Sequence, residues 1–139
     1  MKARLVTTPD ELAQFLAPLS AAGADMFHCS TLKFWEPEFE GSNLNLAGWT
    51  RKLTGKPAIS GGSVNCNTAF RDSDRPPNDV NGVMDNAGDA AARIAGEEFD
   101  LIAVGRALIA NPAWPDITRR GAYHELVPFD NDDCNARLY

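Results

Sequence analysis

Residues 56–64 read Lys-Pro-Ala-Ile-Ser-Gly-Gly-Ser-Val, and residues 99–112 read Phe-Asp-Leu-Ile-Ala-Val-Gly-Arg-Ala-Leu-Ile-Ala-Asn-Pro. Each stretch is a short apolar run that stops at glycine, where backbone N–H groups can approach a phosphate closely. In a (β/α)₈ barrel, the loops after the last two strands frequently hold a cofactor phosphate. The two stretches lie one structural repeat apart, and they therefore favour the end of such a barrel.

Helix and strand signals alternate on both sides of these stretches. The sequence predicts a helix that begins at Thr8 and ends at Gly23, and further helices over 43–53, 80–97 and 111–120. It predicts strands over 25–30, 57–60 and 100–104, the last covered on both faces because it is nearly all apolar. Residues 121–139 are expected to form an irregular tail. This alternation implies a parallel sheet with right-handed crossovers, as in a barrel or in a small doubly wound sheet.

Composition narrows the class of protein. The chain has 139 residues, 44% of them hydrophobic, and a net charge of −6. A complete barrel typically needs about 250 residues. The acidic balance argues against a nucleic-acid partner. No apolar run approaches the ~18 residues of a membrane span, and no signal-peptide core follows Met1, so a cytoplasmic location is expected.

The cysteines and histidines give little support to a metal site. Cys29, Cys66 and Cys134 are widely spaced and form no CxxC pair, so free thiols are expected. A site that combines them with His28 is disfavoured by the spacing. A strand histidine such as His28 could face the barrel interior, but a packed, hydrogen-bonded core histidine is expected rather than a catalytic one. The loop carboxylates Asp72, Asp74 and Asp79 are expected to be solvated. His124 is expected to be solvated in the tail.

The candidate cofactor-binding residues are Gly62, Ser63, Gly105 and Arg106. A phosphate needs several N–H donors that converge on one point without side chains in the way, and glycines at adjacent strand ends meet that need. Arg106 adds a fixed charge and a fork of donors. In the alternative interpretation, these glycines only turn the chain.

Four stretches together resemble the C-terminal part of the Old Yellow Enzyme family, the FMN-dependent NAD(P)H:flavin oxidoreductases or ene-reductases. They are Phe-His-Cys-Ser-Thr (27–31), Phe-Trp-Glu-Pro-Glu-Phe (34–39), Leu-Asn-Leu-Ala-Gly-Trp (44–49) and Val-Gly-Arg-Ala-Leu-Ile-Ala-Asn-Pro (104–112). The resemblance runs from about Thr8 to Phe129. It implies a partial (β/α)₈ TIM barrel in which residues 1–139, apart from the tail, supply roughly strands six to eight.

The resemblance also implies roles for individual residues. Gly62 and Ser63 would donate backbone N–H groups to the FMN phosphate, and Gly105 and Arg106 would complete that cradle. Phe34 and Trp35 would border the substrate mouth, or would instead form a hydrophobic lid that packs on a neighbouring loop. The family's substrate-anchoring residues, its proton-donating tyrosine and most contacts to the flavin ring belong to its first half, so the chain alone is expected to be inactive.

Three hypotheses follow for function. In the first, the chain is the FMN-phosphate-binding portion of an oxidoreductase that passes hydride from NAD(P)H to FMN and then to an activated alkene or similar small-molecule acceptor. In the second, it is a non-catalytic phosphate-binding or assembly module. In the third, it is the product of a truncated or frameshifted gene. Because three parallel strands cannot close a barrel, self-association or pairing with a separate N-terminal half is expected.

Overall fold

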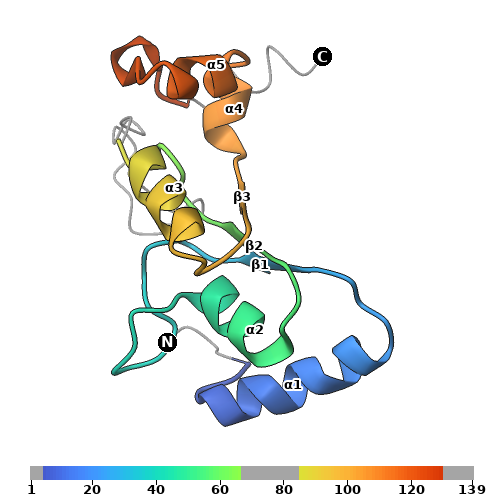
Figure 1. The fold of residues 1–139 in the computed structure, drawn as a ribbon. Helices are drawn as coiled ribbons and strands as arrows, with labels where there is room; N and C mark the ends of the chain where they lie inside the picture. Colours follow the sequence, from blue (N-terminus) through green and yellow to red (C-terminus); the bar gives the residue numbers. More distant parts are fainter. Residues whose placement is uncertain (1–4, 67–84, 130–139) are drawn as a thin grey trace.

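The computed structural model describes residues 5–66 and 85–129, which form a mixed α/β structure (Figure 1). The strands of the described part are β1 (Phe27–Ser30), β2 (Ala58–Gly61) and β3 (Leu101–Ala103). The helices are α1 (Pro9–Ala21), α2 (Leu46–Thr54), α3 (Ala87–Ala95), α4 (Arg106–Ala110) and α5 (Trp114–Arg119), followed by a 3₁₀ turn over Tyr123–Glu125. The predicted alternation of helices and strands is confirmed. Residues 67–84 and 130–139, which include the loop carboxylates, Cys134 and the start of the helix expected over 80–97, lie outside the described residues.

The three strands form one parallel sheet in the order β1-β2-β3. The register places His28, Ile59 and Leu101 side by side, and two residues further along it places Ser30, Gly61 and Ala103 side by side. Since side chains alternate along a strand, these six residues share one face of the sheet. The opposite face carries Phe27, Cys29, Ala58, Ser60 and Ile102.

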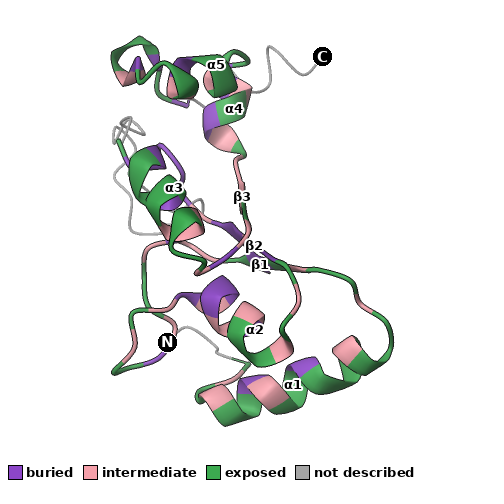
Figure 2. Ribbon diagram, in the orientation of Figure 1, coloured by how far each residue is buried: buried purple, intermediate pink, exposed green. Residues whose placement is uncertain are grey.

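Within the described part of the chain, helices cover one face of the sheet and leave the other uncovered. Cys29 and Ala58 are buried in the main core together with Ala47 of α2, Ala90 of α3 and Phe99 (Figure 2). On the other face, His28 and Ser30 are exposed and Leu101 is 48% exposed. The expectation that the third strand is covered on both faces is therefore wrong. The reason is that α2 and α3 both contribute to the core on the same side, and no described segment covers the other side.

Local signals set the ends of the first two helices. Thr8 caps α1, because its side chain accepts a hydrogen bond from the Glu11 backbone N–H at 3.2 Å, and Pro9 occupies the first helical position as predicted. Helix α2 begins three residues later than predicted because Asn45 is its N-cap, and it ends at Gly55, whose φ of 67° is left-handed.

The C-terminal part differs more from the sequence prediction. A helix was expected from residue 111 to residue 120, but α5 begins only at Trp114. The short helix α4, which follows directly on Gly105, was not predicted at all. Both helices lie beyond the end of β3 (Figure 1).

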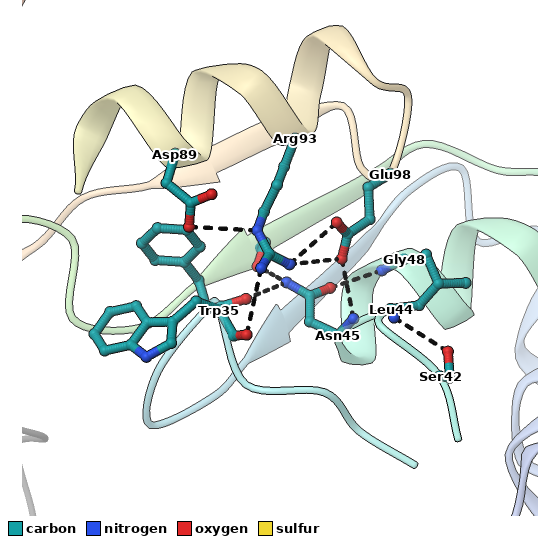
Figure 3. Close-up of polar contacts among 10 residues, drawn as sticks. Trp35, Ser42, Leu44, Asn45, Gly48, Asp89, Arg93 and Glu98 are labelled. Carbon is teal, nitrogen blue, oxygen red and sulfur yellow. Dashed lines mark hydrogen bonds and ion pairs between the residues drawn. The ribbon is translucent and has the colours of Figure 1, made fainter. Parts of the chain in front are cut away.

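A polar network joins α3 to the loop that leads into α2 (Figure 3). Arg93 binds both carboxylate oxygens of Glu98, at 3.2 and 3.1 Å. Glu98 in turn accepts the backbone N–H of Asn45 at 3.0 Å, and the Asn45 side-chain amide donates to Phe34 O at 2.6 Å and to Ser60 Oγ at 2.9 Å. The network therefore fixes the loop after β1 against the covered face of the sheet.

Among the described residues, no helix combines the length and the apolar character needed to cross a bilayer.

Candidate functional site

A pocket of about 650 Å³ lies at the carboxyl ends of the three strands. It is lined by His28, Ser30, Thr31, Leu32, Gly61, Gly62, Ser63, Val64, Cys66, Ala103, Val104, Gly105 and Arg106. The four residues that the sequence predicts to bind a cofactor, Gly62, Ser63, Gly105 and Arg106, thus meet in one place. They come from two loops that are more than forty positions apart in the chain.

The loop after β2 is held tightly against the loop after β1. Gly62 has a φ of 147°, and a Cβ at this position would stand 2.5 Å from the backbone oxygen of Thr31. Thr31 Oγ1 donates to Gly61 O at 2.8 Å, and the Phe34 N–H donates to Gly62 O at 3.1 Å. Glycine is therefore required at position 62 both by its backbone conformation and by the space available.

Ser63 continues this loop with a left-handed φ of 54°. Its hydroxyl donates to Leu32 O at 2.8 Å and accepts from Nη2 of Arg106 at 3.2 Å. The Ser63 side chain therefore joins the loops that follow all three strands.

The loop after β3 forms the opposite wall of the pocket. A Cβ built on Gly105 would have no atom within 4 Å, so this glycine borders open space, in contrast to Gly62. Arg106 follows at the start of α4 and places its guanidinium against Ser63.

His28 occupies a different environment from the one predicted. It is exposed and lines the pocket, so the expectation of a packed core histidine is wrong. The physical reason is the one-sided covering of the sheet: Phe27 and Cys29 point to the core, and the alternation of the strand turns His28 and Ser30 to the other face. The alternation was visible in the sequence, but the side that the helices cover was not.

Phe34 and Trp35 do not line the pocket. Phe34 is fully buried in the main core, and Trp35 packs against it with the rings edge-on and their centroids 5.2 Å apart. This arrangement favours the packing alternative over the substrate mouth.

Cys66 lies near Arg106 but is not activated by it. Burial raises the pKa of the Cys66 thiol, and the nearby Arg106 and the Ala107 N–H only partly oppose this rise. Cys29, on the covered face, is buried and donates to Thr50 Oγ1 at 3.4 Å. No cluster of three or more potential metal ligands occurs within residues 5–66 and 85–129.

The charges around the pocket suit an anion. The Arg106 guanidinium lines it, and no aspartate or glutamate is present in the part of the lining that the structure describes. This contrasts with the net charge of −6 for the whole chain. An anionic group in the pocket would therefore lie near the Arg106 guanidinium.

Comparison with known proteins assigns no family: no protein-family model matches the chain, and no curated protein matches it. The pocket is therefore the feature that bears most directly on function. Its position outside the carboxyl ends of parallel strands is the place where α/β proteins generally bind ligands.

Proposed function

We propose that this chain is the C-terminal, FMN-phosphate-binding portion of an NAD(P)H-dependent flavin oxidoreductase of the Old Yellow Enzyme type. The observation that carries the proposal is the pocket, in which Gly62, Ser63, Gly105 and Arg106 converge at the ends of adjacent strands. These are the positions at which the sequence resemblance puts the cofactor phosphate.

The arrangement of the helices supports a partial barrel. In a doubly wound sheet, helices cover both faces, whereas in a (β/α)₈ barrel the helices form an outer ring and the inner face packs on other strands. Here the core residues of α2 and α3 lie on one face, and His28 and Leu101 are exposed on the other. We propose that the uncovered face is the inside of a barrel that further β/α units would complete.

The residues present fit the phosphate end of FMN. Gly105 borders open space that a side chain would fill, so its backbone can approach a ligand closely. Gly62, Ser63 and Gly105 would hold the phosphate through backbone N–H groups, and Arg106 would neutralise part of its charge. When bound, the flavin supplies the hydride chemistry between NAD(P)H and an alkene acceptor, while this chain anchors and orients its phosphate end.

The test of this proposal is a fluorescence titration of the chain with FMN. We expect saturable binding that Arg106→Ala weakens about 10- to 100-fold, because a hydrogen bond to a charged group contributes about 1.5 to 3 kcal/mol. Gly105→Val should also weaken binding, since a side chain at this pocket-lining position would occupy open space that the glycine leaves free. The matched control is Arg119→Ala, whose side chain is 75% exposed, pairs with Asp116 and lies outside the pocket lining.

Two outcomes would count against FMN binding. A folded chain with no measurable affinity for FMN would contradict it outright. Inorganic phosphate binding as tightly as FMN would instead support the non-catalytic phosphate-binding module.

The uncovered face also predicts self-association of the isolated chain. Both outer strands of the described sheet, β1 and β3, have an open edge, and Leu101 of β3 exposes an apolar side chain on the uncovered face. In size-exclusion chromatography, we expect the apparent mass to exceed 15.1 kDa and to fall on dilution. Leu101→Lys should shift the equilibrium toward the monomer, whereas Leu19→Lys on α1, a position that is 43% exposed, should not. A monomer whose elution does not change with concentration would show that these edges do not drive association.

A further inference from the structure

His28 stands out among the residues of the pocket because its ring has no part in holding the fold together. The side chain is exposed on the uncovered face of the sheet, while its neighbours Phe27 and Cys29 pack in the core. Within residues 5–66 and 85–129, the imidazole makes no hydrogen bond or ion pair. Its two nitrogens are therefore available to a ligand.

The position of the ring directs it toward the glycine loop. The Cα of His28 lies opposite Ile59, two residues before Gly61 in the register and so about 6 to 7 Å lower along the strands. Its Nε2, however, lies only 3.4 Å from the point where a Cβ on Gly61 would stand. The ring therefore leans toward the carboxyl end of the sheet and ends beside the residue that precedes Gly62.

Gly61 and Ala103 leave the space that this geometry needs. These two residues pair with each other across β2 and β3, on the same face of the sheet as His28. Both are too small to cover the imidazole. A ligand anchored at Arg106 and Ser63 would share this pocket with Gly61 and with Nε2 of His28. The pocket volume of about 650 Å³ also falls in the range of sites for organic ligands and is far larger than a phosphate needs.

We propose that His28 is a specificity-determining residue that hydrogen-bonds, through Nε2, a hydroxyl group carried next to the phosphate of a phosphate monoester. The inference rests on the proposed FMN site and adds one residue to it: His28 would contact the hydroxylated chain next to the phosphate, the ribityl part of FMN. A neutral imidazole can donate or accept such a hydrogen bond. Arg106 and Ser63 hold the anion, and His28 hydrogen-bonds the hydroxylated part of the ligand, which inorganic phosphate lacks.

The experiment compares FMN with inorganic phosphate as a competitor in the fluorescence titration. The variants are His28→Ala, His28→Phe, which keeps a ring but removes the hydrogen bond, and Arg106→Ala. The matched control is His124→Ala, since His124 is exposed and does not line the pocket. Thermal melts of each variant establish that the exposed position 28 tolerates the change.

We expect both His28 variants to weaken FMN binding about tenfold and to leave phosphate binding within about twofold of wild type. Unchanged FMN binding in both variants, with binding lost in Arg106→Ala, would overturn the role of His28 and leave the proposed function standing. Equal losses for FMN and phosphate would also overturn it, because His28 would then act on the anion itself. No FMN binding by the wild-type chain would overturn both.

Discussion

Replacing Asn45 with alanine is expected to lower the free energy of unfolding by about 3 kcal/mol, although this residue lies outside the pocket. Asn45 is fully buried, and its side-chain amide donates to Phe34 O and to Ser60 Oγ. Its Oδ1 accepts the Gly48 N–H at 2.9 Å and so caps α2. Alanine would leave a buried carbonyl and a buried N–H without these partners, and it would also remove the cap, worth about 1 kcal/mol.

Urea denaturation at a fixed protein concentration measures this effect. Asn43→Ala is the matched control, because Asn43 is exposed two positions earlier, and it should change the free energy of unfolding by less than about 0.5 kcal/mol. Asn45→Asp separates the two roles of the side chain: it retains the acceptor for Gly48 but loses the donor to Phe34 and Ser60. A loss below about 1 kcal/mol in Asn45→Ala would show that the buried network relaxes without it.

The second large effect is expected at Gly62, where alanine should destabilise the protein by about 3 kcal/mol and also distort the pocket. The added Cβ would stand 2.5 Å from Thr31 O and 2.9 Å from Thr31 Oγ1, so the backbone of one loop has to move. The φ of 147° adds a conformational penalty for any residue with a side chain.

Gly55→Ala is the control for a glycine substitution that causes no steric clash. Gly55 also has a left-handed φ, 67°, but a Cβ there would meet nothing within 4 Å. It should therefore cost only about 1 to 2 kcal/mol, the price of the left-handed backbone. Chemical denaturation gives both values, and the difference between them reports the clash with Thr31 together with the more strained φ of Gly62. Equal losses in the free energy of unfolding at the two positions would mean that the loop after β1 moves away from the added Cβ at no measurable cost.

Asn45 and Gly62 both influence the position of the pocket-lining residues. Asn45 and Gly62 both fix the segment from Thr31 to Phe34, the first from the covered side of the sheet and the second from the pocket side. Within that segment, Leu32 O accepts a hydrogen bond from the Ser63 hydroxyl, and the same hydroxyl accepts one from Arg106. The position of the guanidinium therefore depends on contacts well outside the pocket.

Several features follow from the sequence because their causes are local. The Thr8 cap and Pro9 start α1, and Gly55 ends α2, through conformational preferences of single residues. The apolar runs that stop at Gly61 and just before Gly105 form β2 and β3. The glycines that follow these runs therefore lie at the same edge of a parallel sheet. The meeting of Gly62, Ser63, Gly105 and Arg106 in one pocket could therefore be predicted.

Other features were decided only by the tertiary structure. Whether Phe34 borders a pocket or fills the core, and whether His28 is packed or exposed, depends on which face of the sheet α2 and α3 cover. Alternation along a strand divides its side chains into two sets, but it does not say which set is buried. That choice is made by packing between residues far apart in the sequence, such as Ala47, Ala58 and Ala90 in the main core, and so it appears only when the chain is folded.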